Sequence, residues 1–163
     1  MNFYTYVDSP IGRLLLHSDG TALTGLYMDV SSRPPQGMGE WVEDASSGPL
    51  PDTIRQLEEY FAGGRRAFDL PLRLHGTAFQ QRVWNVLKEI PYGVTWSYGD
   101  LAKRIDQPTA SRAVGLANGR NPISILVPCH RVIGADGSLT GYGGGLQRKQ
   151  WLLAHEGLPE HAA

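Results

Sequence analysis

The sequence that decides the fold lies at residues 123–132 and reads ISILVPCHRV. The run before Pro128 is short, apolar and rich in β-branched residues, so it predicts a buried strand. Pro128 fixes the direction of the chain just before Cys129, because the proline ring restricts φ. We therefore expect the thiol of Cys129 to be held at the end of a buried strand.

Cys129 is the only cysteine among 163 residues. A single thiol excludes an intramolecular disulfide and a cysteine-rich zinc site, and we expect neither a metal nor another cofactor. The chain suits a reducing compartment. Its first residues do not read as a secretory signal, and no stretch approaches the ~20 apolar residues of a membrane span. These patterns predict a soluble, cytoplasmic protein that does not bind a membrane.

The neighbours of Cys129 suit a nucleophile, although a lone cysteine is more often a small buried apolar residue. His130 can act as a base or stabilise a thiolate, and Arg131 adds positive potential. Because adjacent residues of a strand point to opposite faces, His130 would reach the thiol only through a turn or a bridging water. Glu156, at the end of a helix expected over 146–156, is a candidate to orient His130. An exposed glutamate is the alternative.

Two short helices before this motif predict a helix-turn-helix. Ser97 with Asp100 makes a capping box for the first helix. Residues 106–108 (DQP) end it, and Thr109 is expected to cap the second helix. That helix has a surface of small residues with Arg112 as its only long side chain, which suits a minor groove better than a major groove. A helical hairpin packed in an ordinary core is the alternative.

The first half of the chain predicts an antiparallel sheet, with turn residues between short runs of β-formers. The strands are expected at 3–7, 14–16 and 23–28. Residues 31–50 are expected to form a long loop, and 51–63 a helix that ends at paired glycines. Thr77 and Gln80 form a capping box for a further helix. We place the domain boundary at 70–76, which gives domains 1–75 and 76–163.

The charge is nearly balanced, with 15 basic and 16 acidic residues and a formal net charge of −1. This balance argues against electrostatic capture of nucleic acid by the whole molecule. Residues 1–75 carry six Lys/Arg against ten Asp/Glu, whereas residues 76–163 carry nine against six. The second half is therefore the candidate nucleic-acid face, with chance as the alternative explanation of so small a difference.

The second half resembles the O6-alkylguanine-DNA alkyltransferases, also called methylated-DNA–protein-cysteine methyltransferases. The matching motifs are FQQRVW at 79–84, IPYG at 90–93, SY at 97–98, SRAVG at 111–115, NP at 121–122, PCHRV at 128–132, GYGGGL at 141–146 and WLLAHEG at 151–157. The first seventy residues match only loosely, mainly in DSPIG at 8–12. The resemblance implies an α+β fold, with a small N-terminal antiparallel-sheet (RNase H-like) domain of structural role. A mainly helical C-terminal domain would carry the helix-turn-helix and the PCHRV motif.

The resemblance implies DNA repair by direct reversal. Cys129 would take an alkyl group from O6-alkylguanine, with O4-alkylthymine as a further substrate left open, after the base is flipped out of duplex DNA. The transfer would be irreversible, so each molecule would act once. His130 would accept the thiol proton through water, and Glu156 would orient His130. Tyr98 would donate a hydrogen bond to guanine N3, and Asn121 would link the recognition helix to the turn of the nucleophile.

The remaining site residues are also implied by the resemblance. Those that would bind the substrate base are Val132, Tyr142, Gly143 and Ser124. Those that would contact DNA are Thr109, Ala110, Ser111, Arg112, Ala113, Gly115 and Arg120. Arg112 would fill the space left by the flipped nucleotide. Ser124 stands where some members have a proline that lines the alkyl pocket, so the range of alkyl groups stays open.

The expected partner is double-stranded DNA that contains O6-alkylguanine, bound by a monomer, with cooperative assembly along DNA left open. The main alternative is an alkyltransferase-like protein that binds the lesion without reacting, and Cys129 argues against it because such proteins lack the nucleophile. A thiol hydrolase would have no use for the helix-turn-helix. A transcription factor would need the major-groove readers that this helix lacks.

Overall fold

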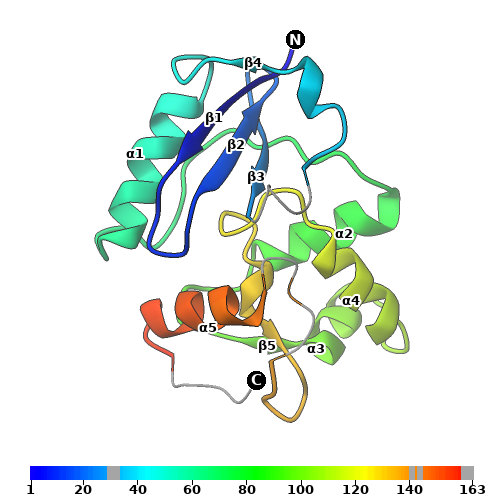
Figure 1. The fold of residues 1–163 in the computed structure, drawn as a ribbon. Coiled ribbons are helices and arrows are strands. Elements are labelled where there is room, and N and C mark those ends of the chain that lie inside the picture. The colour runs from blue at the N-terminus through cyan, green and yellow to red at the C-terminus, as the bar shows by residue number, and fades with distance from the viewer. Residues whose placement is uncertain (29–33, 140–141, 143–144, 159–163) are drawn as a thin grey trace. The chain divides into compact units, whose positions relative to one another are not determined.

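The computed structural model describes residues 1–28, 34–139, 142 and 145–158. The chain separates into two compact units, Met1–His75 and Gly76–Ala163, whose elements are labelled in Figure 1. Within the described residues the first unit is a sheet with a helix, and the second is mainly helical. The α+β class predicted from the sequence is confirmed.

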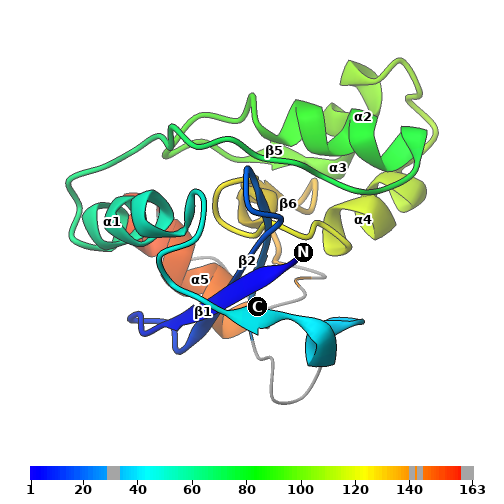
Figure 2. The same cartoon turned by 90° about the horizontal axis from the view of Figure 1, so that it is seen from above.

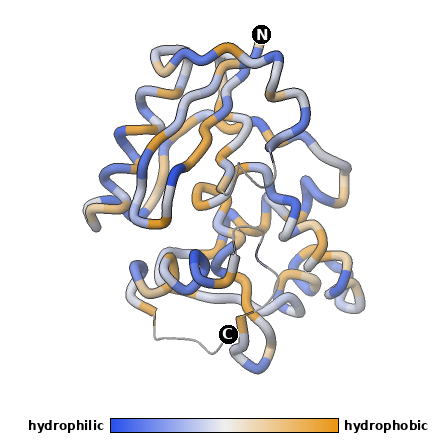
Figure 3. The backbone as a smooth tube through the Cα atoms, in the orientation of Figure 1, coloured by the Kyte–Doolittle hydropathy of each residue, from blue (hydrophilic) through white to orange (hydrophobic). Residues whose placement is uncertain are grey.

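The sheet of the first unit has the order β3-β2-β1-β4. Its strands are β1 (Phe3–Val7), β2 (Leu14–Ser18), β3 (Leu23–Tyr27) and β4 (Val42–Glu43). β1 pairs antiparallel with β2, and β2 pairs antiparallel with β3, as short turns between β-formers require. Leu14, Leu15 and Leu16 are fully buried, and hydrophobic and hydrophilic stretches alternate along the chain in Figure 3.

The prediction of a long loop over 31–50 is wrong in part. A short 3-10 helix, η1 (Met38–Glu40), and β4 both fall in this stretch. β4 pairs parallel with β1, and the Val42 amide donates to the Asn2 carbonyl at 2.9 Å. The strand exists because it meets the edge of β1, a partner far away in sequence, so its own residues give no periodic signal.

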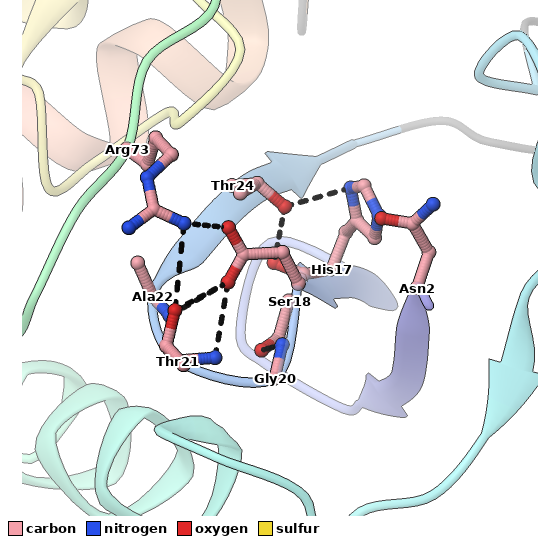
Figure 4. Close-up of polar contacts among 9 residues, drawn as sticks. Asn2, His17, Ser18, Gly20, Thr21, Ala22, Thr24 and Arg73 are labelled. Carbon is pink, nitrogen blue, oxygen red and sulfur yellow. Dashed lines mark hydrogen bonds and ion pairs between the residues drawn. The ribbon is translucent and has the colours of Figure 1, made fainter.

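Polar residues in the first unit are satisfied locally. The helix α1 (Leu50–Phe61) buries Gln56, whose Nε2 donates to the Asp69 carbonyl while its Oε1 accepts from the Asp69 amide, both at 2.9 Å. At the turn between β2 and β3, the carboxylate of Asp19 accepts from the amide of Thr21 and forms an ion pair with Arg73 (Figure 4). In both places the hydrogen-bond partners belong to the first unit.

The second unit is built from helices and one short parallel ladder. Its elements are α2 (Ala78–Leu87), β5 (Trp96–Ser97), α3 (Tyr98–Arg104), α4 (Ser111–Gly119), η2 (Cys129–Arg131), β6 (Val132–Ile133) and α5 (Leu146–His155). The helices α2, α3 and α4 pack side by side (Figure 2). Both predicted capping boxes are present, one at Thr77 and one at Ser97.

The prediction that Thr109 caps the second helix of the helix-turn-helix is wrong. α4 begins at Ser111 after Ala110, and no side chain caps it. Asp106 adopts a left-handed φ of 59°, and the Ala110 amide donates to the Gln107 carbonyl at 2.9 Å. These features make a turn that contains Thr109, so its hydroxyl is not at the helix start.

The prediction of a strand over 123–127 is also wrong, although the burial is right. The segment folds back as a turn in which the Val127 amide donates to the Ile123 carbonyl at 3.1 Å. Ile125 takes a left-handed φ of 72°, which is uncommon for a β-branched residue. A short apolar run is consistent with any buried segment, and here the amides of Leu126 and Val127 bond to carbonyls within the segment. In the part of the chain that the structure describes, no helix has the length and apolar character to cross a membrane.

Candidate active site

Cys129 begins the single turn of η2 and is 4% exposed. Its amide donates to the Val127 carbonyl at 2.8 Å, and the Arg131 amide donates to the Pro128 carbonyl at 3.0 Å. The chain then enters β6, whose Val132 amide donates to the Cys129 carbonyl. Cys129 and His130 therefore lie in the same 3-10 turn. In a turn, unlike in a strand, neighbouring side chains need not point to opposite faces.

Behind this turn lies a buried ionic group of three residues. His130 Nε2 lies 2.8 Å from Glu156 Oε2. Arg131 donates to the same carboxylate through Nε at 2.8 Å and Nη2 at 3.0 Å, and to the Ile90 carbonyl through Nη1 at 2.8 Å. The positive charge expected from Arg131 is thus directed at Glu156. The sequence had indicated the contact of Glu156 with His130 but not the second contact with Arg131.

The ionic group fixes the protonation states of its members. Burial acts to raise the pKa of Glu156, but the hydrogen bonds and charges of His130 and Arg131 outweigh it and hold this pKa well below its usual range. Burial lowers the pKa of His130, and Glu156 opposes that effect only in part. The imidazole is therefore neutral in the resting protein. Because a carboxylate only accepts, Nε2 carries the proton and Nδ1 presents a lone pair.

The thiol itself is protonated at rest. Burial raises the pKa of Cys129, opposed by hydrogen bonding from Asn121, by the charge of Lys149 and by Ser124. Lys149 is fully buried on α5, and burial lowers its pKa to about 8. Its Nζ lies 6.0 Å from the centre of the Tyr142 ring. Sequence reasoning missed Lys149, although it lies two helical turns before Glu156, the residue that caps the C-terminal end of α5.

Two asparagines, one in the last turn of α4 and one just after the helix, hold the segment that carries the thiol. Asn121 Nδ2 donates to the Val127 carbonyl at 2.7 Å, and its Oδ1 accepts from the Ile123 amide at 3.0 Å. These two bonds join Asn121 to the segment that precedes Cys129. Asn118, which sequence reasoning missed, is also buried, and its Nδ2 lies 3.4 Å from the Cys129 carbonyl oxygen.

The candidate base-binding residues lie on several elements of the second unit. Val132 is buried on β6 and pairs with Trp96, while Ser124 lies in the turn before the cysteine. Tyr142 has its pKa raised well above the usual value by burial. Tyr98 begins α3, and its ring lies against Gly115 of α4, where an added Cβ would meet it at 3.7 Å. Gly143 lies outside the described residues.

The candidate DNA-contacting residues lie on α4 and its ends. Thr109, Arg112, Ala113 and Arg120 are exposed, whereas Ala110, Ser111 and Gly115 are half-buried. Arg112, Leu116 and Arg120 recur every four residues, so they share one face of the helix. In the described ranges, no group of three or more His, Cys, Asp or Glu side chains is placed to hold a metal ion.

Comparison with known proteins identifies the family. Residues 78–158 match the DNA binding domain of 6-O-methylguanine DNA methyltransferase, and residues 2–74 match the ribonuclease-like domain of 6-O-methylguanine DNA methyltransferase. The two matches together span both units. The chain belongs to the 6-O-methylguanine DNA methyltransferase family, and the resemblance found in the motifs is confirmed.

Relatives and solved structures agree. The methylated-DNA–protein-cysteine methyltransferase of Mycolicibacterium paratuberculosis is 54% identical over 153 residues, which cover 94% of this chain and 91% of the relative. The protein of the same name from Methanosarcina acetivorans is 51% identical over 155 residues, covering 95% and 98%. The crystal structure of Mycobacterium tuberculosis O6-methylguanine methyltransferase superposes with a TM-score of 0.88 at 52% identity, covering 96% of this chain and 93% of that one. The structure of Mycobacterium tuberculosis OGT in complex with DNA gives 0.86 at 52% identity, covering 94% and 92%.

Proposed function

We propose that this protein repairs DNA by direct reversal, as a methylated-DNA–protein-cysteine methyltransferase that moves the alkyl group of O6-alkylguanine to Cys129. The observation that carries the proposal is the thiol on a tight turn beside a histidine with one nitrogen held by a carboxylate. A thiol activated by an oriented base is the arrangement that nucleophilic catalysis requires. Relatives of more than half identity are named for this reaction.

The first step removes the thiol proton. Because burial keeps Cys129 protonated, attack requires a base, and neutral His130 offers Nδ1. The proton passes through a water to Nδ1, which produces a thiolate and an imidazolium. Glu156 stabilises that imidazolium through Nε2, and Arg131 keeps Glu156 ionised. The role of Arg131 is therefore to maintain the carboxylate that holds the base in place.

The second step transfers the alkyl group. The thiolate sulfur attacks the alkyl carbon in line with the C–O6 bond, a new S–C bond forms, and the electron pair of the C–O6 bond moves to the base. The base takes up one proton, which balances the one released by the thiol, and leaves as neutral guanine, helped by a hydrogen bond from Tyr98 to N3. The carbonyls of Cys129 and Val132 accept from the exocyclic amine, and the alkyl pocket includes Ser124 and Tyr142. A thioether is stable, so one molecule repairs one lesion.

DNA is bound through α4. Chemistry at O6 requires the nucleotide to leave the stack, and a helix with small residues at 110, 111, 113 and 115 can approach a minor groove closely. Arg112 fills the space left by the flipped base, while Thr109 and Arg120 flank the helix. We place DNA binding and alkyl transfer in residues 76–163 and a structural role in 1–75. We infer that the protein acts as a monomer in the cytoplasm. Cooperative assembly on DNA and reaction with O4-alkylthymine are left to experiment.

The decisive experiment is mass spectrometry after incubation with a duplex that contains one O6-methylguanine. We expect one methyl group per protein, on the peptide of Cys129, and no labelled protein from Cys129→Ala. Repeated turnover, or methylation of another residue, would contradict the proposal.

The same experiment separates the reactive protein from a lesion binder. Tight binding to the lesion duplex, with an unmodified Cys129 and an unrepaired base, would favour an alkyltransferase-like protein instead. Binding by Cys129→Ala with loss of transfer is the result expected of a reactive enzyme whose nucleophile has been removed.

A further inference from the structure

Asn118 makes a contact with the nucleophile that the proposed mechanism does not use. It lies on α4, the helix that carries Arg112, and is 1% exposed. Its Nδ2 lies 3.4 Å from the carbonyl oxygen of Cys129. The end of α4 is fixed by Trp84, whose indole nitrogen donates to the Ala117 carbonyl at 2.9 Å. Because a carbonyl only accepts, the NH₂ side of the amide must face Cys129, which turns Oδ1 of Asn118 the other way.

Two buried acceptors, on a residue that contacts the Cys129 carbonyl and on the residue after Cys129, have no hydrogen-bond partner among the described residues. They are Oδ1 of Asn118 and Nδ1 of His130. Nδ1 accepts because Nε2 carries the ring proton toward Glu156. Buried polar atoms of this kind are costly unless a partner completes them. One group that donates twice and accepts once would satisfy both acceptors and also receive the thiol hydrogen, and water has that capacity.

We propose that Asn118 is a positioning residue for alkyl transfer, whose Oδ1 and the Nδ1 of His130 together anchor the water that accepts the Cys129 proton. The inference rests on the proposed function and deepens it. As the water takes the S–H proton it gives one of its own to Nδ1, leaving a thiolate, an imidazolium and an unchanged water. Oδ1 keeps the other water hydrogen throughout, so the water stays aligned while the proton moves.

The charged and titratable groups near the proposed water come from α5 and its C-terminal cap, from the turn η2 and from the segment before α5. Glu156 and Lys149 face the site from α5, and Arg131 lies on the same turn with its charge on Glu156. Tyr142 interacts with Cys129 from the segment before α5. Asn118 is neutral at every pH, so its replacement by an apolar residue leaves this set of charges intact. A change in the pH dependence after that replacement would then report the relay.

The test compares Asn118→Leu with Asn85→Leu, the same change at an exposed position of α2. Rates of methyl transfer from O6-methylguanine DNA and of Cys129 alkylation by iodoacetamide are measured from neutral pH to above the ordinary thiol pKa. At neutral pH we expect Asn118→Leu to slow both reactions on the order of tenfold, part of what positioned proton transfer contributes. The deficit should shrink as the pH rises, because hydroxide then removes the proton directly. Asn85→Leu should match the wild type.

An equal loss at every pH, or no loss, would overturn the inference, because a purely structural role changes the rate without changing the pH profile. A high-resolution crystal structure of the wild type tests it without any variant. We expect a water within hydrogen-bond distance of both Asn118 Oδ1 and His130 Nδ1, and a water that contacts only one of them, or none, would overturn it. Wild-type failure on O6-methylguanine DNA would refute the proposed function alone, since the iodoacetamide profile and the water need no DNA.

Discussion

Each unit of the molecule holds a buried or half-buried histidine whose pKa is lowered by burial, but the two rings have different surroundings. His17 in the first unit stacks on Trp41 with ring centroids 3.7 Å apart. Its Nδ1 meets Thr24 Oγ1 at 2.9 Å and its Nε2 meets Asn2 Oδ1 at 3.0 Å (Figure 4). His130 in the second unit has Nε2 on a carboxylate, and no described residue partners its Nδ1. A ring with both nitrogens bonded to neutral groups supports structure, whereas one with a free lone pair and an anion behind it can take a proton.

The contrast extends to the other buried polar residues. Among the described residues, those buried in the first unit are neutral, and they are Thr5, Ser18, Thr24, Thr53 and Gln56. The second unit buries His130, Arg131, Lys149 and Glu156, which are ionisable. Buried charges demand partners and rarely improve on apolar packing. The second unit therefore maintains a costly polar centre, as expected at a site of chemistry.

The largest effect should come from Glu156→Gln. This change leaves the buried guanidinium of Arg131 without its counter-charge, which costs about 3–5 kcal/mol of unfolding free energy. Urea unfolding measures the loss. Glu89→Gln is the matched control, because Glu89 is exposed and lies 3.7 Å from exposed Arg104, and such pairs contribute about 0–1 kcal/mol. Equal losses of unfolding free energy in the two variants would show that the buried Glu156 contributes no more to stability than an exposed glutamate.

Acid should reveal the same group through linkage. The pKa of Glu156 is lowered in the folded protein, so its contribution to stability is complete above its ordinary pKa of 4.5. It is lost as the pH falls toward the lower folded pKa, because protonation then breaks the ion pair. Wild type should lose more stability than Glu156→Gln over this range, as unfolding at a series of pH values can show.

A smaller effect is expected from His17→Gln. The pKa of His17 is lowered from 6.5 to about 4 by burial, partly opposed by Asp19. Between these values the unfolded chain binds a proton that folded His17 does not, so stability is complete above pH 6.5 and falls toward pH 4. Replacing His17 should flatten that dependence without slowing alkyl transfer. A slower transfer would mean that the first unit takes part in the chemistry.

The smallest effect on stability belongs to Arg112→Ala, within about 0.5 kcal/mol, because the side chain is exposed. Repair of a duplex should nevertheless slow by about tenfold. Flipping the base costs a few kcal/mol, and Arg112 offsets part of this cost by filling the space that the base leaves. Reaction with the free base O6-benzylguanine should keep its rate. If both substrates slow equally, Arg112 does not act in base flipping.

Local sequence patterns predicted what depends on neighbours along the chain. The strands β1 to β3, the capping boxes at Thr77 and Ser97, and the burial of 123–127 all follow from spacing and residue type. The errors occur where backbone hydrogen bonds decide the local conformation. β4 forms because it pairs with β1, a partner far away in the sequence. The segment before Cys129 and the segment before α4 are turns, in which the Val127 amide bonds to the Ile123 carbonyl and the Ala110 amide bonds to the Gln107 carbonyl, and residue type and spacing do not reveal either bond.

The candidate site shows the same division. The sequence by itself determined that the chain has one thiol, that His130 follows it, and that its motifs match one family, because these are properties of order and spacing. Only the tertiary structure decided that Arg131 faces Glu156, that Lys149 is buried near the thiol and that Asn118 reaches the Cys129 carbonyl. Such contacts join turns and helices separated along the chain, and their strength depends on exclusion of water, which arises only when the elements pack.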